Sequence, residues 1–79
     1  MWIRSQDKTR LIKPDYIRIN GNDIEAIRFD MLCNKIGEYS SEEKLLKVLD
    51  MIQKSISSHE NFVFQMPLDS EVEEDEKED

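Results

Sequence analysis

The sequence contains little of what most enzymes and metalloproteins use. Its single cysteine, Cys33, and single histidine, His59, cannot supply the ligands of an ordinary zinc site. Its two glycines, Gly21 and Gly37, are too few for a glycine-rich phosphate loop or a dinucleotide-binding fingerprint. The acidic residues match no calcium loop, and Cys33 has no histidine near it in sequence to form a nucleophilic dyad. We therefore expect a protein that is not an enzyme and has no cofactor or metal.

Long hydrophobic runs are also missing. No signal-peptide-like apolar run opens the chain, and no stretch approaches the length of a membrane span. A lone cysteine excludes an internal disulfide, whereas small secreted domains usually carry several. We therefore expect a cytoplasmic protein with no membrane partner. Its 79 residues, 38% of them apolar, can form one small core without a deep enclosed pocket.

The net charge of −7 is concentrated at the C-terminus. Residues 68–79, LDSEVEEDEKED, hold eight acids and one base, whereas residues 1–67 hold ten of each. A block of like charge with few apolar residues cannot offset the entropy lost on ordering. We predict one domain over residues 1–67 and a disordered acidic tail over residues 68–79. The tail either keeps the protein in solution or acts as an electrostatic hook for a basic partner.

The segment YSSEEKLLKVLDMIQKSISSH has the pattern of an amphipathic helix over about residues 41–57. Ser40 and Glu43 match a capping box, in which each side chain satisfies an amide of the first turn. Glu43 also lies four residues before Lys47, a favourable order for an ion pair. The apolar stripe recurs at steps of three and four residues: Leu45, Val48, Leu49, Ile52 and Ile56.

Alternating apolar residues predict strands before and after this helix. In YIRIN every second residue is isoleucine, and the NGND that follows favours a tight hairpin turn. After the helix, FVFQM alternates in the same way until Pro67 ends the strand. The segment KIGEY predicts a further short strand that leads into the helix cap. In MWIRSQDKTRLIK we predict a β-hairpin, or an edge strand with its turn, and we interpret its basic residues as a solvated face and Trp2 as a lid on the core rim.

Residues 23–33 fit two structures. As a strand, Ile24 and Ala26 share one face while Ile27 lies on the other, which requires a bulge near Ala26 or two strand pieces. As a helix, Asp23 would be the cap, and several apolar residues have helical spacing. The hairpin turn just before this segment favours the strand.

These elements predict an α+β fold. We expect a small antiparallel sheet of four to six short strands with one amphipathic helix packed on it. The N-terminal part is rich in strands, the helix follows, and a final strand comes last. The expected core residues are Ile3, Leu11, Ile17, Ile19, Ile24, Ile27, Phe29, Tyr39, Leu45, Leu49, Ile52, Ile56, Phe62 and Phe64.

The residues left for function form a surface rather than a pocket. We expect them to bind another protein, or to form a homodimer that covers an exposed strand edge through Trp2 and the first strand. The candidate interaction surface consists of Trp2, Arg4, Arg18 and Arg28 and of the tail acids Glu73, Glu74, Asp75 and Glu76.

A nucleic-acid-binding sheet is the alternative. The segment IGEYSSEEKLLKVLD is similar to the strand-to-helix junction of plant ethylene-response DNA-binding domains and of the arm-binding domains of phage-type recombinases. Those domains place a basic sheet face in the major groove, and Arg4, Arg18 and Arg28 could share such a face here. Residues 1–67 carry no net positive charge to bind phosphates, and the tail opposes such binding, so we rank nucleic acid below protein as a partner.

Four segments taken in order resemble one family. MWIRSQDKTRLI, IRINGNDIEAI, IGEYSSEEKLLKVLDMIQ and FVFQMP are similar to short proteins of Gram-positive bacteria, their phages and their integrative elements. In that family an opening W/Y-IRSQD, an LG-x-Y-x-S/T-x-E junction and a terminal F/Y-x-MP recur. The resemblance covers about residues 1–67 and supplies no established activity and no catalytic residues. It implies a small accessory protein of phage or mobile-element origin. We expect it to act by binding another protein, and inhibition of a host or defence protein is one role of this kind.

Overall fold

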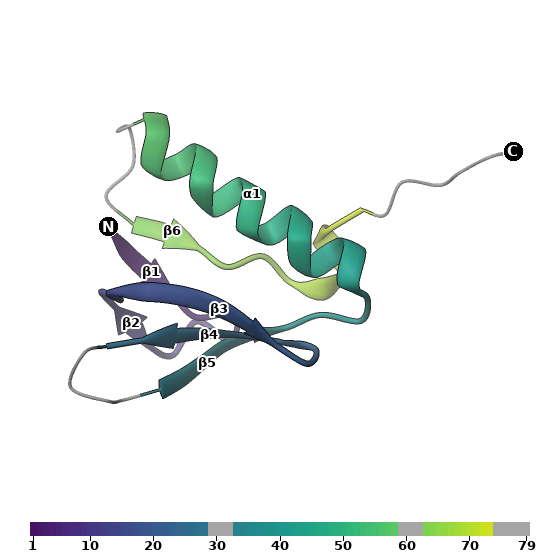
Figure 1. Cartoon of the computed structure of the whole chain (residues 1–79), viewed down its shortest axis with the longest axis horizontal. Coiled ribbons are helices and arrows are strands. Elements are labelled where there is room, and N and C mark those ends of the chain that lie inside the picture. Colours follow the sequence, from purple (N-terminus) through teal and green to yellow (C-terminus); the bar gives the residue numbers. More distant parts are fainter. Residues whose placement is uncertain (29–32, 59–62, 74–79) are drawn as a thin grey trace, which may run out of the picture.

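A computed structural model describes residues 1–28, 33–58 and 63–73. The strands and the helix follow the order expected for the α+β fold, and this fold class is confirmed (Figure 1). The described elements are β1 (Trp2–Arg4), β2 (Leu11–Ile12), β3 (Tyr16–Asn20), β4 (Asp23–Ile27), β5 (Cys33–Glu38), α1 (Glu42–Ser58), β6 (Val63–Gln65) and a short 3₁₀ helix, η1 (Asp69–Glu71).

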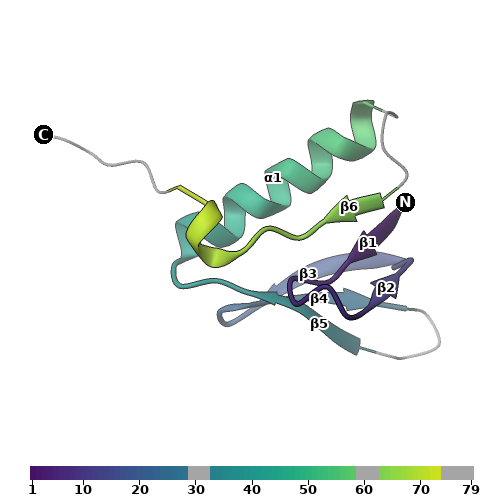
Figure 2. The same cartoon turned by 180° about the vertical axis from the view of Figure 1, so that it is seen from behind.

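The described strands form two sheets rather than one. In the β4 sheet the order is β3-β4-β5 and all pairs are antiparallel. In the β1 sheet the order is β2-β1-β6, and β6 runs parallel to β1 because α1 carries the chain back across the molecule. Figures 1 and 2 show α1 along one side of the molecule with both sheets on its other side. The sheets meet at Gln6, whose amide donates to the carbonyl of Ile36 at 2.8 Å.

The first turn of α1 is capped one residue later than predicted. The amide of Lys44 donates to Oγ of Ser41 at 3.2 Å, so Ser41 is the cap and the expected capping box of Ser40 and Glu43 does not form. The amide of Ser40 is used elsewhere, because it donates to Asp69. The predicted pair of Glu43 and Lys47 is present, at 3.9 Å.

The strand interpretation of residues 23–27 is confirmed. Ile24 and Ala26 are fully buried, and the turn before them contains Gly21 at φ 64°, a backbone conformation that glycine adopts without strain. The predicted irregularity lies on the neighbouring strand. β4 pairs Ile24 with Gly37 but Glu25 with Lys35, so the extra residue is Ile36 of β5.

The core lies between α1 and the sheets. Its buried apolar residues are Ile3, Ile24, Ala26, Ile36, Tyr39, Leu45, Val48, Ile52, Met66 and Val72. Ile17, Ile19 and Phe64 are partly buried against this cluster, and the expected residues Phe29 and Phe62 lie outside the described residues.

Two expected core residues are exposed. Leu11 has 54% of its surface exposed, because the hairpin register pairs Ile3 with Ile12 and turns Leu11 to the other face. Ile56 is 53% exposed, because it lies near the end of α1 at the rim of an open groove.

The predicted boundary at residue 67 is wrong, because residues 68–73 belong to the domain. Leu68–Val72 turn through η1, and Val72 is buried in the core cluster with 5% of its surface exposed. Lys47 on α1 donates through Nζ to the carbonyl of Glu73 at 2.5 Å. The acidic composition of this segment suggested disorder, although Val72 is buried and Asp69 and Glu73 form specific hydrogen bonds with the rest of the domain.

Candidate functional site

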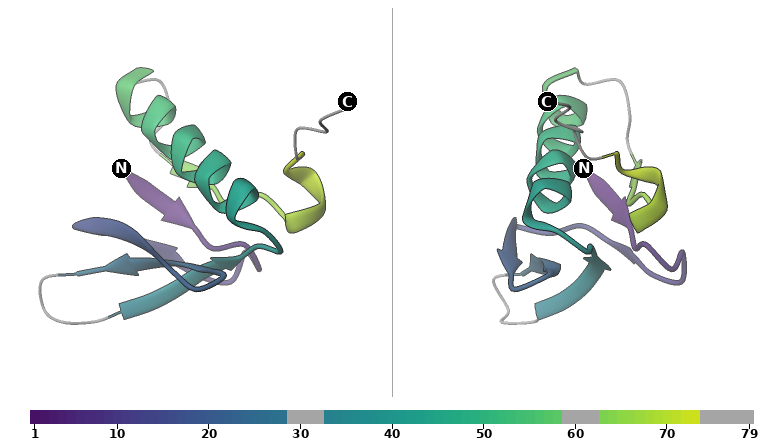
Figure 3. Two further views of the ribbon diagram at one scale, coloured as in Figure 1. Left: turned by 45° about the vertical axis from the view of Figure 1, so that its right-hand side comes forward. Right: turned by 90° about the vertical axis from the view of Figure 1, so that its right-hand side faces the viewer.

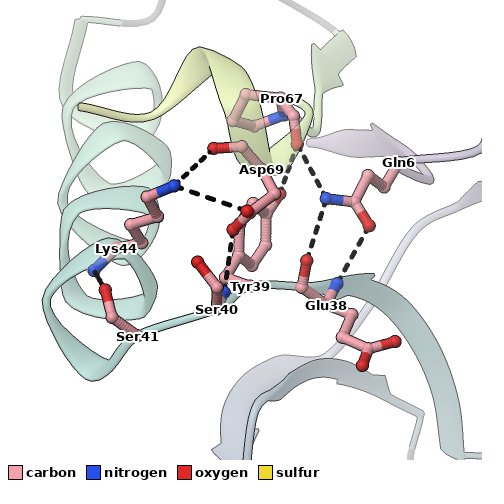
Figure 4. A network of polar contacts seen from close by, with 8 residues as sticks. All are labelled: Gln6, Glu38, Tyr39, Ser40, Ser41, Lys44, Pro67 and Asp69. Carbon is pink, nitrogen blue, oxygen red and sulfur yellow. Dashed lines mark hydrogen bonds and ion pairs between the residues drawn. The ribbon is translucent and has the colours of Figure 1, made fainter. Parts of the chain in front are cut away.

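A network of hydrogen bonds joins the two sheets to the segment after β6 (Figure 4). Gln6 acts like an added strand residue: its side chain donates to the carbonyl of Glu38 at 3.1 Å and accepts from the amide of Glu38 at 3.0 Å. The same side chain donates to the carbonyl of Pro67 at 3.2 Å. The hydroxyl of Tyr39 also donates to Pro67, at 2.6 Å, and burial raises the pKa of Tyr39 above its ordinary value.

Asp69 forms the other half of this network. Its carboxylate accepts from the amide of Ser40 at 2.8 Å and lies 3.4 Å from Nζ of Lys44, which also donates to the carbonyl of Asp69 at 2.9 Å. The bond from Ser40, assisted by Lys44, holds the pKa of Asp69 below its ordinary range. Gln6, Tyr39, Lys44 and Asp69 therefore all have partners within the network, most of them main-chain groups (Figure 4). We interpret the network as a structural clasp rather than a catalytic site.

An apolar groove of about 490 Å³ opens between α1 and β3. Tyr16 and Ile17 of β3 form one wall, and Leu49 and Ile56 of α1 form the other. The buried core residue Ile3 also lines the groove. Figure 3, right, shows β3 in blue and β1 in purple on opposite sides below α1. β3 is an edge strand, and within the described residues no other strand pairs with its outer edge.

The outer face of the β1 sheet is a second notable surface. The register places Trp2 beside Val63 and Arg4 beside Leu11, with all four side chains pointing away from the core. Trp2 is 43% exposed and Val63 is 48% exposed. The structure thus brings together two of the predicted interaction residues, Trp2 and Arg4, and adds two that the sequence did not single out.

The other predicted interaction residues lie elsewhere. Arg18 is on β3 in the other sheet, where its Nε forms an ion pair with Glu25 at 2.9 Å. Arg28 is exposed and follows β4. The expectation that Arg4 shares a sheet face with Arg18 is therefore wrong, because the strands belong to two sheets. Glu73 is exposed at the end of the described chain, and three further predicted residues, Glu74, Asp75 and Glu76, lie outside the described residues.

The first strand does not provide an exposed edge for a homodimer. β1 lies between β2 and β6, so its main-chain groups are paired on both sides. The described strands that end a sheet are β2, β3, β5 and β6. The prediction that a second copy could pair with an exposed edge of the first strand is therefore wrong.

Cys33 is exposed and lies near two charged side chains. Its Sγ is 3.7 Å from Nη2 of Arg18 and 3.9 Å from Oε1 of Glu25. His59, the single histidine and so the one possible histidine partner for Cys33 in a nucleophilic dyad, lies outside the described residues. Over residues 1–28, 33–58 and 63–73, no group of three or more His, Cys, Asp or Glu residues is placed to hold a metal ion.

The helix that the structure describes is neither long nor apolar enough to cross a membrane. The chain matches no protein-family model, no curated protein and no solved structure.

Proposed function

We propose that this chain is a non-catalytic protein-binding module, and that its partner inserts an extended segment into the groove between α1 and β3. The observation that carries the proposal is the coincidence of an open strand edge with an apolar groove. Proteins that bind peptides by strand addition use this arrangement: the edge supplies main-chain hydrogen bonds, and the groove accepts every second side chain.

The edge of β3 has few of the features that usually protect an edge strand. Natural sheets block their edges with lysine, proline, bulges or inward-pointing charges. β3 is five residues long with Arg18 as its one charged residue, and Arg18 is already paired with Glu25. The bulge of this sheet lies between β4 and β5, on the far side from the open edge.

The groove also leaves apolar surface in water. Tyr16 and Ile56 are both about half exposed, and both line it. An inserted segment with alternating apolar residues would cover these side chains, and burial of apolar surface contributes about 25 cal/mol per Å². The affinity would therefore come from the groove, and the orientation from the strand edge.

The family resemblance suggests the setting of this interaction. A small accessory protein of phage or mobile-element origin would act in the cytoplasm on a host or defence protein. It would inhibit that protein by holding one of its extended segments against β3, where the segment could pair with nothing else. Neither an active site nor a cofactor is needed for such a role, because the module would act by presenting surface.

Peptide selection on the full chain tests the proposal. Random 12-residue peptides would be selected on the immobilised protein, and the dissociation constants of the best binders measured. We expect alternating apolar residues in the selected peptides. Ile56→Glu, which places a charge at the groove, should weaken their binding by about tenfold or more.

Leu46→Glu is the matched control. Leu46 is 49% exposed, similar to Ile56, and lies on the same helix without lining the groove. Binding should be unchanged by this substitution. Equal losses for both variants, with both folded by circular dichroism, would contradict the proposal.

A further inference from the structure

We infer that the outer face of the β1 sheet is a second binding surface, independent of the groove, and that it takes an acidic protein segment carrying large apolar side chains. The groove and this face are lined by different residues, so an experiment can contradict binding at one surface while supporting binding at the other. If both hold, the chain joins two partner segments.

The apolar part of this face is set by strand register. Leu11 lies beside Arg4 across the hairpin, and Val63 lies beside Trp2 in the parallel pair. Ile3 on the same strand points the other way and is buried, so the three large apolar side chains of the outer face share one side of the sheet. Tryptophan and arginine are the residues most enriched among those that dominate protein–protein binding energy.

A shallow hollow of about 420 Å³ lies on this face. Its lining combines apolar and basic side chains: Arg4, Lys8, Thr9, Arg10, Leu11 and Val63. The hollow is open rather than enclosed by the core, so a partner side chain could reach both the aliphatic surface and the cations.

The charge around the hollow is positive, although the whole chain is acidic. Residues 1–14 contain four bases, Arg4, Lys8, Arg10 and Lys13, and one acid, Asp7, which gives a net charge of +3. Within the described part of the chain, no carboxylate forms an ion pair with Arg4, Lys8 or Lys13.

The guanidinium groups of Arg4 and Arg10 both form hydrogen bonds within the chain, and these bonds leave the positive charge of Arg4 free to attract a partner. Arg4 donates through Nε to the carbonyl of Lys8 at 3.1 Å, which orients its guanidinium but neutralises no charge. Arg10 instead turns toward β5, where it donates to the carbonyl of Lys35 and, at 3.4 Å, to Oδ1 of Asn34. Among the cations that line the hollow, Arg4 and Lys8 are thus the two that do not turn toward β5, and an acidic partner would complement them.

The mixed chemistry selects one class of partner. Nucleic acid offers phosphates and ring faces, whereas this hollow pairs its cations with the aliphatic side chains of Leu11 and Val63. The chain's own residues 73–79, EEDEKED, offer acids but no large apolar side chain. A protein segment with both acidic and apolar residues satisfies the whole surface.

Binding of three labelled 12-residue peptides to the full chain tests the inference. One alternates Glu with Leu and Phe, one replaces each Glu with Lys, and one replaces each apolar residue with Ser. We expect the first to bind at least about tenfold more tightly than the other two, with an affinity that falls as salt rises. An alternating peptide could also enter the groove, so the comparison is repeated on the Ile56→Glu variant, in which the groove is blocked. The same order of affinities should persist there, which separates this face from the groove.

Matched substitutions locate the site. Lys8→Asp and Lys54→Asp change the net charge equally, and Asp tolerates the positive φ of 68° at position 8. Lys8→Asp should lower the affinity for the first peptide by about fivefold or more, whereas Lys54→Asp should change this affinity by less than about twofold. Leu11→Ser should weaken it as well, whereas Leu46→Ser should not.

Several results would overturn the inference. Equal effects of Lys8→Asp and Lys54→Asp would show that only net charge matters. Tighter binding of a 12-nucleotide single strand, competing with the first peptide, would make the face a nucleic-acid site. Equally tight binding of a synthetic peptide of residues 73–79 would make its occupant the chain's own tail.

Discussion

The hydroxyl of Tyr39 donates a hydrogen bond of 2.6 Å to the carbonyl of Pro67, joining the residue after β5 to the second residue after β6. Tyr39 is fully buried, and Gln6 donates to the same carbonyl. Because Pro67 keeps one donor, Tyr39→Phe should lower the free energy of unfolding by about 1 kcal/mol, measured by urea denaturation at pH 7. A change within error would show that this bond adds no net stability.

Tyr39 should also make the protein sensitive to alkali. Its pKa is raised in the folded state, mainly by burial, so the unfolded phenol ionises first, near its ordinary value of 10.0. The stability contributed by this difference is complete below pH 10 and is lost as pH rises above it. Between pH 8 and 11 the parent should lose about 1.4 kcal/mol more than Tyr39→Phe. Parallel losses in both proteins would contradict the assignment.

Gly37 is required by close packing rather than by backbone conformation. A Cβ at this position would lie 2.9 Å from the Tyr39 ring and 3.2 Å from Cε of Met66. The ring cannot easily move, because its hydroxyl is bonded, so Gly37→Ala should cost about 1–3 kcal/mol in thermal or urea unfolding. Gly21→Asn is the control: nothing lies near its Cβ position, and Asn tolerates a φ of 64°. Similar losses for the two variants would contradict this account.

Asp7 organises the turn between β1 and β2. It accepts from Oγ of Ser5 at 2.7 Å and from the amide and hydroxyl of Thr9, and these bonds lower its pKa to about 2. Its contribution to stability is therefore present above pH 3.8 and is lost as pH falls toward 2. Ser5→Ala removes the largest cause and should raise the pKa of Asp7, followed by carboxyl carbon NMR. A value near 3.8 in the parent would exclude these bonds in solution.

The corrected domain boundary predicts different effects of two truncations. A chain ending at Pro67 loses the burial of Val72 and the bonds of Asp69, and should be less stable by about 2 kcal/mol or more. A chain ending at Glu73 keeps every described contact and should unfold like the parent in urea. Equal stability of both truncations would place residues 68–73 outside the domain.

Sequence periodicity predicted the elements well where one face of an element meets the core. Helix α1 and strands β3 and β6 follow from their apolar spacing, and the turn at Gly21 from its NGND sequence. Leu11 and Ile56 were misplaced, because spacing identifies an apolar stripe without showing how far the opposing sheet extends.

The proposed binding surfaces were harder to predict, since both depend on the division into two sheets. Trp2 and Arg4 could be selected by residue type, but the placement of Trp2 beside Val63 depends on a parallel pairing between strands that α1 separates in sequence. The groove depends on β3 being an edge strand, which local sequence does not encode. Val72 was overlooked because the surrounding acids suggested a disordered tail.

Hydrogen exchange at β3 tests the central claim most directly. Asn20 pairs with Asp23 around a two-residue turn, so alternation places the amides of Ile17 and Ile19 on the outer edge and that of Arg18 toward β4. We predict that a peptide selected on the full chain slows exchange at Ile17 and Ile19 by about tenfold or more while leaving Arg18 little changed. Unchanged exchange at both isoleucines in the saturated complex would contradict strand addition at β3.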